Sequence, residues 1–335
     1  MELDLPPYLQ RANDDPPPPA PRGRERALRL ALLCALPAVA LFELGAGCWS
    51  RSRAPEPADY ALLEPAMAEL YKPGDLVVVA PRWAEPYARA SVPDARVFTL
   101  ETLGRSDAGT YARAIEISAL GAHAPELSQF REVERRSVGP FELRVLENPA
   151  PEHVLFDFVE NLEPRWASAF GTTGGPGGGG TRCTWSERAR PAAGGLGGHP
   201  GFPARRFVCP EGFYLNVSAT VIADEEFLPR RCIYAHPTEQ GERVVRFDKV
   251  PLGDKIVGHA GLYWMIERAQ LGAPIRLEVR VDGDVVGALI HTDGEGWRRF
   301  EFPLGGHAGA EASVEFAVSS TDYRDRHFCF QADTR

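Results

Sequence analysis

The chain has 335 residues, 44% of them hydrophobic, and carries a formal net charge of −9. This apolar content is enough to form hydrophobic cores, which excludes a globally disordered protein. The acidic balance argues against a partner that is held through its phosphates, so we expect no nucleic-acid partner. The length fits two domains of ordinary size.

The N-terminal part combines a polar tail with an apolar segment. Residues 1–26 are rich in proline and contain the run Pro16 to Pro19, so they are expected to be disordered or polyproline-like. Arginines then precede an apolar run that reaches about 20 residues, enough to span a bilayer. We predict a transmembrane signal anchor over residues 27–49, with the amino terminus in the cytoplasm and the residues after about 50 in the periplasm.

Two alternatives to the anchor remain open at this segment. One is an export signal that is cleaved nearby. The other is a lipoprotein, because Leu44 to Cys48 resembles a cleavage box in which Cys48 would be lipidated, although Gly45 stands where a larger apolar residue is usual. We favour the anchor, and each alternative still exports the rest of the chain.

Residues 60–150, which follow a linker over 50–59, alternate between helix and strand patterns. Residues 76–80 form a continuous apolar run, typical of a strand buried on both faces. The patterns predict a small Rossmann-like α/β unit with a mostly parallel sheet and right-handed crossovers. The expected helices are 60–71, 83–90, 107–114 and 125–135, and the expected strands are 76–80, 97–100, 115–120 and 141–146.

Open α/β sheets bind ligands at the carboxyl ends of their strands. Arg82 and Trp83 follow the first expected strand, and His123 follows the third. Arg82 could bind an anion and His123 could act as an acid or base. Loop residues that merely pack or face water give the same pattern, and neither GxGxxG nor GxxxxGK[ST] is present to cradle a phosphate.

The stretch from Arg276 to Phe302 has the clearest strand pattern. Leu277, Val279 and Val281 alternate with charged residues, which gives one apolar and one polar face. The turn around Gly283 and a second polar, Gly-rich turn divide the stretch. We therefore predict three consecutive antiparallel strands here.

Similar patterns extend over residues 151–335 and predict an antiparallel β-sandwich, specifically a jelly roll. A Gly-rich segment at 171–181 is expected to be a mobile loop within it. The further strands are expected at 154–158, 207–209, 215–223, 244–250, 261–266, 312–318 and 327–332.

The later half of the chain contains Cys183, Cys209, Cys232 and Cys329. In an exported domain they suggest two disulfides, and of the three connectivities we predict Cys183–Cys209 with Cys232–Cys329. The spacing does not suit zinc. We predict no cofactor, although a structural calcium would suit the carboxylates of the turn at 291–295.

That turn also supplies candidate ligand-binding residues. His291, Asp293 and Glu295 surround glycines, and Trp297 shares the parity of the polar residues in its strand. An exposed Trp there would be a platform for stacking a sugar ring. Hairpin-turn residues and a Trp that closes the core edge explain the same pattern.

Two further residue sets could contribute to a site. The aromatic set adds Trp264 and Tyr234 as candidates, together with Trp185, Tyr214 and Tyr263. The histidine set comprises His199, His236, His259 and His291, each in an expected loop. If several of these residues met at one end of the sandwich, they would favour a binding site over scattered surface positions.

Two families resemble parts of residues 60–335. The segments GDLVVVAPRWAEP, IEISALGAHAPEL and FELRVLENP are similar to the water-exposed C-terminal region of bacterial polytopic glycosyltransferases like protein mannosyltransferases. The segments RRCIYAHP, VRFDKVPLG, VDGDVVGALIHTDGEGWRRFEF and RHFCFQADTR resemble galactose-binding-like jelly rolls. Such transferases have many membrane spans and catalytic acids on their first outer loop, so the resemblance implies an accessory portion and transfers no catalytic residue.

These patterns favour a membrane-anchored exported protein whose carbohydrate-binding-type sandwich recognises an envelope glycan or polymer without catalysis. One alternative is a glycan-active enzyme, either a hydrolase or a relative of glycosyltransferases, with carboxylates such as Asp224 or Glu295 brought together by folding. The other is a structural accessory subunit of a membrane glycosyltransferase.

Overall fold

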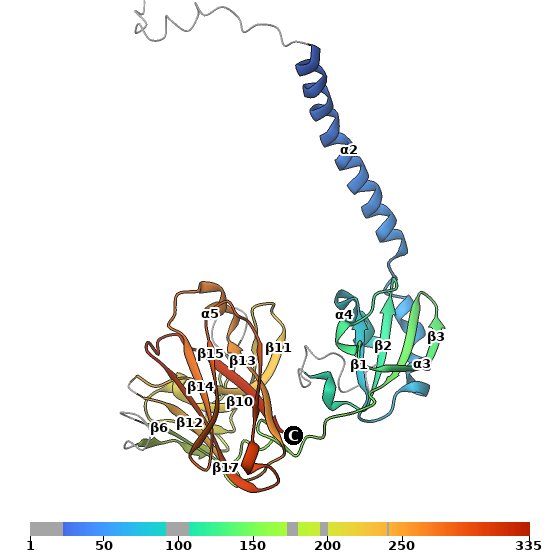
Figure 1. Cartoon of the computed structure of the whole chain (residues 1–335). Coiled ribbons are helices and arrows are strands. Elements are labelled where there is room, and N and C mark those ends of the chain that lie inside the picture. Colours follow the sequence, from blue (N-terminus) through green and yellow to red (C-terminus); the bar gives the residue numbers. More distant parts are fainter. Residues whose placement is uncertain (1–22, 92–106, 173–179, 195–199, 240) are drawn as a thin grey trace, which may run out of the picture. The chain divides into compact units, whose positions relative to one another are not determined.

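Figure 1 shows the computed structural model, which places the chain in two units, Met1–Ala54 and Pro55–Arg335. The strand expected at 97–100, His199, most of the Gly-rich loop and most of the Pro-rich tail lie outside the described residues. The structure describes residues 23–91, 107–172, 180–194, 200–239 and 241–335.

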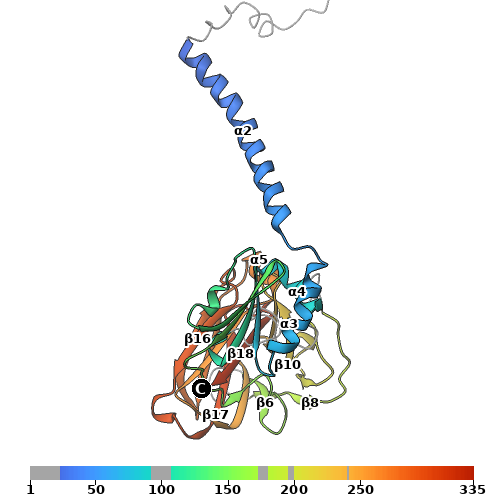
Figure 2. The same cartoon turned by 90° about the vertical axis from the view of Figure 1, so that its right-hand side faces the viewer.

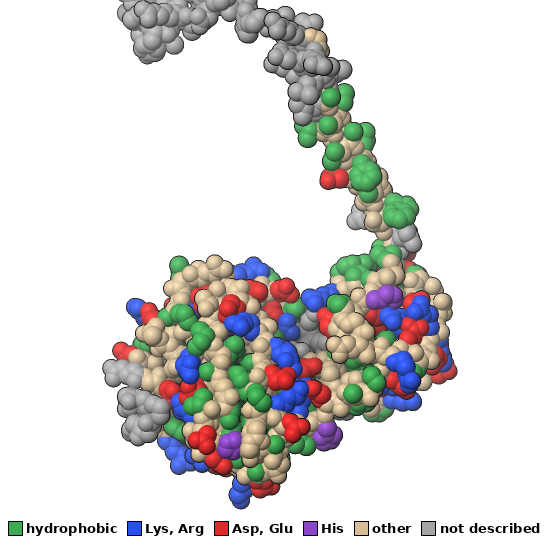
Figure 3. Space-filling model, viewed as in Figure 1, with side chains coloured by type: hydrophobic (Ala, Val, Ile, Leu, Met, Phe, Trp, Pro, Cys, Tyr) green, Lys and Arg blue, Asp and Glu red, His purple; other side chains and the backbone are tan. Residues whose placement is uncertain are grey.

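The first unit contains helix α2 (Gly23–Arg53). Its window Leu33–Ser50 has a mean hydropathy of 1.5. Large apolar side chains such as Leu36 and Phe42 are each 76% exposed, and hydrophobic side chains line the helix in Figure 3. By length and composition α2 can cross a membrane, and an export signal has the same character.

The α/β unit has a sheet of four described strands in the order β1-β2-β4-β3. β1 runs parallel to β2, whereas β2–β4 and β3–β4 are antiparallel pairs. The predicted mostly parallel sheet is therefore wrong for the described residues. The strands are β1 (Leu76–Ala80), β2 (Arg113–Ala119), β3 (Arg131–Val138) and β4 (Phe141–Glu147).

Two expected helices, 107–114 and 125–135, are wrong. Each starts with one short turn, η4 (Ala108–Thr110) or η5 (Pro125–Leu127), and the chain then enters a strand. The charged residues of β3 favour a helix by propensity, but they form cross-strand ion pairs with β4, including Arg135–Glu142 at 3.1 Å. Charge on this strand also protects a sheet edge from further pairing.

Both faces of β1 are buried, as predicted. Helices α3 (Leu63–Leu70) and α4 (Glu85–Ser91), seen together in Figure 2, pack with η2 (Asp59–Leu62) and η3 (Arg82–Ala84) on the face that carries Val77. On the other face, Val78 packs with Leu127 and Leu146.

The second unit, Pro55–Arg335, contains the α/β unit and, after it, an antiparallel sandwich of two sheets, as predicted. The first sheet has the order β16-β13-β18-β11-β10-β9-β8, with β5 beside β18. The second has the order β15-β14-β17-β12-β6-β7. The first sheet comprises β5 (Phe156–Asp157), β8 (Thr184–Ser186), β9 (Arg206–Val208), β10 (Val217–Ala223), β11 (Pro229–Ala235), β13 (Lys255–Leu262), β16 (Arg298–Pro303) and β18 (Phe328–Thr334). The second comprises β6 (Ala167–Thr172), β7 (Gly180–Arg182), β12 (Arg243–Pro251), β14 (Ile275–Val281), β15 (Asp284–His291) and β17 (Glu311–Ser320).

Aromatic side chains fill the space between the two sheets. Phe158 lies edge-on to Phe247 and to Phe316, with ring centroids 4.9 and 4.8 Å apart. Phe316 stacks on Phe330 of the facing sheet at 4.7 Å. These contacts join strands from both sheets into one core.

The stretch Arg276–Phe302 is only partly as predicted. β14 and β15 form the expected hairpin, with Asp282 and Gly283 both at positive φ in the turn. β16, however, pairs with β13 in the other sheet. The strand expected at 261–266 also ends early, because β13 stops at Leu262 and the chain turns into helix α5 (Trp264–Ala269).

Both predicted disulfides are confirmed. Cys183–Cys209 links residues 26 apart in the sequence, and Cys232–Cys329 links residues 97 apart. The second disulfide joins the neighbouring strands β11 and β18 and belongs to a small cluster that also contains Phe202. This cluster is separate from the core between the sheets.

Candidate functional site

Several connecting segments leave the sandwich at one end, as the strand register shows. β10 begins opposite the end of β11, and β18 begins opposite the end of β13. β17 likewise ends opposite the start of β14. The segments 209–216, 236–239, 263–274 and 321–327 therefore lie at the same end.

Two adjoining cavities open among these segments, and we call them together the end groove. The larger is about 770 Å³ and the smaller about 330 Å³. Both sizes fall within the range of about 300–1,000 Å³ that is typical of ligand pockets. They share Glu211, Leu215 and Tyr323. The larger cavity adds Phe213, Tyr214, His236, Asp325 and His327, and the smaller adds Thr172, Thr181, Thr238 and Glu239.

Aromatic rings form one wall of the groove. Phe213 and Tyr214 are 42% and 45% exposed. Phe213 packs edge-on against buried Phe202, with centroids 4.8 Å apart, and Arg206 lies 5.9 Å from its centroid. The wall is therefore supported from behind while part of each ring faces solvent, which is the arrangement that stacking on a ligand requires.

His327, which lines the larger cavity, forms a hydrogen-bonded pair with the buried Tyr234. Tyr234 donates its hydroxyl proton to the Tyr214 carbonyl at 3.0 Å, and its oxygen lies 2.8 Å from His327 Nδ1. The His327 Nδ1–H therefore donates to this oxygen, and a neutral His327 ring carries its acceptor at Nε2. Tyr234 is fully buried, and burial raises its pKa well above the usual value. The candidate Tyr234 thus supports the groove from below and lies out of reach of a ligand.

His236 lies beside this pair. Its Nδ1–H donates to the Pro237 carbonyl at 2.8 Å, and its ring is 5.5 Å from that of His327. Burial lowers the pKa of His236 to about 4. The imidazole is therefore neutral at ordinary pH and presents a hydrogen-bonding edge without charge.

This burial predicts an acid-dependent loss of stability. Between pH 6.5 and 4 the unfolded chain binds a proton at His236 that the native protein does not, so stability falls as the pH falls, by up to about 3 kcal/mol. We expect His236→Asn, which retains a donor near Nδ1, to flatten the pH dependence of urea unfolding by about this amount. An equal change in His153→Asn, at an exposed histidine, would contradict the assignment.

A buried guanidinium lies behind the smaller cavity. The Arg243 side chain is 0% exposed, its Nη2 lies 3.4 Å from Glu211 Oε1, and its Nη1 donates to Cys183 Sγ at 3.2 Å. Burial lowers the pKa of Arg243, and the adjacent Glu211 carboxylate acts in the opposite direction by favouring the charged guanidinium. A side chain at Gly171 would meet Glu211 Oε1 at 2.7 Å, so glycine leaves room for this pair.

The predicted turn residues serve the structure of the same end of the sandwich. His291 is fully buried, and its Nε2 lies 2.6 Å from Glu267 Oε1. Glu267 also accepts hydrogen bonds from the backbone of Leu262 and Gly294, at 2.9 and 2.7 Å. The turn is thus fastened to α5, and the candidate His291 is not accessible to a ligand.

The two acids of this turn also have protein partners. Asp293 forms a buried ion pair with Arg326 and accepts from Gly272 N at 3.0 Å. Glu295 accepts from its own turn, at Thr292 N, and from Arg298 Nη1 at 2.7 Å. Neither acid lines the end groove.

The two tryptophan candidates are half-buried. Trp297 lies parallel to His259, with centroids 6.5 Å apart, and Arg230 is 5.9 Å from its centroid. Trp264 packs against Phe227 at 5.0 Å. Strand parity places Trp297 on the outer face of its sheet, where Arg230 and His259 lie beside its half-buried ring, so the arrangement is nearer to a Trp that closes the core edge than to an open platform.

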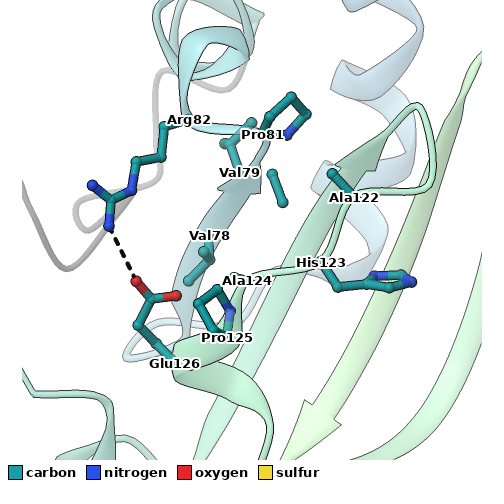
Figure 4. Close-up of a pocket in the computed structure, with 10 residues that line it drawn as sticks. Val78, Val79, Pro81, Arg82, Ala122, His123, Ala124, Pro125 and Glu126 are labelled. Carbon is teal, nitrogen blue, oxygen red and sulfur yellow. Dashed lines mark hydrogen bonds and ion pairs between the residues drawn. The ribbon is translucent and has the colours of Figure 1, made fainter.

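The α/β unit has a smaller cavity of about 250 Å³ at the ends of β1 and β2, shown in Figure 4. Arg82 lies at its edge, 3.5 Å from Glu126, and Trp83 is not among the lining residues. His123 points away from Arg82 and lies 3.0 Å from the buried carboxylate of Glu116. The structure therefore brings Arg82 and His123 to one cavity without directing them at a common point.

Cysteine chemistry offers no metal ligands at the groove. Cys183 and Cys209 lie close to Glu211, but the two sulfurs form a disulfide and cannot act as thiolates. Cys48, the alternative lipidation residue, is exposed and unpaired in α2.

Comparisons with known proteins do not identify a family. No family model and no curated protein matches the chain. The solved structure of CBM51 from Clostridium perfringens GH95 in complex with methyl-galactose is 14% identical, with a TM-score of 0.25, over 35% of this chain and 81% of that chain. CBM51-2 with INT domains from Clostridium perfringens ZmpB, in complex with GlcNAc, is 10% identical, with a TM-score of 0.28, over 62% of this chain and 41% of that chain. Likenesses at these TM-scores carry no inference about the fold or the ligand.

Most residues of the end groove were not singled out in the sequence. Among the predicted sets, Tyr214 and His236 line it, whereas Glu211, Tyr323, Asp325 and His327 were missed. One signal was available. Glu211 and His327 each lie two residues from a disulfide cysteine, so the disulfides fix the segments that carry them.

Proposed function

We propose that this chain binds a glycan in the end groove. The observation that carries the proposal is the meeting of partly exposed aromatic rings and polar side chains in cavities of ligand size at one end of the sandwich. The apolar C–H face of a sugar ring can stack on Phe213 or Tyr214. Glu211 and Asp325 can then accept hydrogen bonds from its hydroxyl groups.

The aromatic wall gives the first test. We expect Tyr214→Ala and Tyr323→Ala each to weaken glycan binding about tenfold, because truncating a central aromatic residue of an interface commonly costs more than about 1 kcal/mol. The measurement is a glycan array with the full chain in detergent, followed by titration of the strongest glycan. Trp83→Ala, at an exposed ring of the α/β unit, is the control and should bind as wild type does. No binding to any glycan or envelope polysaccharide would refute the function.

We also propose that α2 anchors the protein in a membrane with the sandwich on the extracytoplasmic side. The apolar window of α2 and the two disulfides support this arrangement. Full-length protein should stay in the membrane fraction after carbonate washing. Release by carbonate would instead favour a cleaved export signal. Association with a membrane glycosyltransferase rests on the sequence resemblance alone, and co-purification tests it.

A glycan-active enzyme is a second candidate because two carboxylates, Glu211 and Glu239, line the smaller cavity together. Glycoside hydrolysis uses such a pair across the sugar bond. The predicted acids Asp224 and Glu295 do not supply it, since Asp224 is bound to Arg230 at 2.7 Å and neither acid lines the groove. Release of reducing ends from a bound glycan, lost in Glu239→Gln, would favour the enzyme over simple binding.

A further inference from the structure

Carboxylates dominate the charge of the described end-groove lining. Glu211, Glu239 and Asp325 contribute three negative charges. The lining guanidinium is that of Arg324, and it is already bonded to both oxygens of Asp322, at 3.0 and 2.7 Å. The groove that a ligand meets is therefore acidic, because the charge of Arg324 is already balanced by Asp322.

One of these acids is held in place from behind. Glu211 faces the buried Arg243 guanidinium, yet its side chain is 26% exposed and lines both cavities. Because Arg243 is itself 0% exposed, a ligand can approach the carboxylate but not the guanidinium.

The floor of the smaller cavity has polar atoms without partners, which is a second and independent observation. Thr238 lines this cavity and is 8% exposed, and its Oγ1 has no hydrogen-bond partner among the described residues. Nε of Arg243, just behind the lining, likewise makes no hydrogen bond within the part of the chain that the structure describes. Buried polar atoms are nearly always satisfied, so the unpartnered Thr238 hydroxyl marks a polar position in this lining that the described protein groups leave unused.

We infer that the end groove selects glycans whose sugars carry free amino groups. This inference rests on the proposed glycan function. Ammonium groups on the bound sugars pair with Glu239 and Asp325, which are both exposed at the rim. An N-acetylated sugar of the same shape lacks the positive charge and loses the ion pairs.

A matched pair of probes tests this selection. The full chain in detergent is titrated with a β-1,4-linked glucosamine hexamer and with its N-acetylated counterpart at low salt. We expect the glucosamine hexamer to bind about tenfold more tightly, from two ion pairs of ordinary exposed strength, and the preference to shrink in 0.5 M salt. Glu239→Gln and Asp325→Asn should each weaken binding of the glucosamine hexamer about two- to fivefold more than they weaken binding of the N-acetylated hexamer, because only the glucosamine hexamer loses an ion pair.

Glu311→Gln is the control, because Glu311 is an exposed acid on β17 that does not line the groove. It should keep the wild-type preference. Equal or tighter binding of the N-acetylated hexamer, or a preference that survives both groove substitutions, would overturn the inference. Binding confined to uncharged glycans on the array would overturn it as well and leave the glycan function standing. If neither hexamer and no array glycan bound, the function itself would fail.

Discussion

Replacing Cys232 and Cys329 by alanine is expected to lower the free energy of unfolding by about 4–5 kcal/mol. The disulfide closes a loop between residues 97 apart, and in the chain-entropy model a loop of about 100 residues restricts the unfolded state by about 4.7 kcal/mol. Both cysteines are fully buried on adjacent strands, β11 and β18. Their substitution therefore also removes two sulfur atoms from a packed cluster. Urea unfolding of the full chain in detergent, followed by tryptophan fluorescence, measures the loss.

The shorter disulfide provides a graded comparison. Cys183 and Cys209 are 26 apart, so the same substitution there should cost nearer 3 kcal/mol. It should also weaken ligand binding, because Glu211 lies two residues from Cys209. Cys34→Ala, at an exposed unpaired cysteine of α2, is the control and should change neither property. A loss below about 1 kcal/mol for the longer disulfide would show that the unfolded state is already restricted by other means.

The sandwich could be predicted from sequence because its signals are local. Alternation in β14 buries Leu277, Val279 and Val281, and the Gly283 turn fixes the hairpin with β15. The α/β unit was harder. The run REVERRSV has high helix propensity, and it becomes β3 because β4 supplies cross-strand ion pairs, which no single-segment pattern contains.

The site depends on contacts that are distant in sequence. Trp297 has exposed parity, but whether its face is open depends on Arg230 and His259, which come from other strands. The sequence suggested His291 as a ligand-binding residue, but in the structure its ring is hydrogen-bonded to Glu267, which lies 24 residues away in the sequence. The end groove likewise forms from segments near residues 211, 238 and 325, and sequence spacing does not show that they meet.

Arg326→Met is the second substitution with a large expected effect, a loss of about 3–5 kcal/mol in the free energy of unfolding. The Arg326 and Asp293 side chains are each 3% exposed, so removal of the guanidinium leaves a buried carboxylate without its counter-ion. Arg326 also donates to the Ala273 carbonyl at 3.2 Å, and a side chain at Gly272 would meet its Nη2 at 1.7 Å. The surrounding backbone is thus fitted to this guanidinium.

The Arg326→Met substitution should also affect the end groove, because Arg326 adjoins a residue that lines it. His327 comes directly after Arg326 and lines the larger cavity, so loosening of this segment should also weaken the proposed glycan binding in the protein that remains folded. Arg324→Met is the matched control for stability: its guanidinium is 76% exposed and pairs with Asp322, so its loss should leave the free energy of unfolding nearly unchanged. Adding Asp293→Asn to Arg326→Met should restore part of the stability by removing the unpaired charge. If the double variant were no more stable than Arg326→Met, the cost would lie in lost packing and the ion-pair explanation would be wrong.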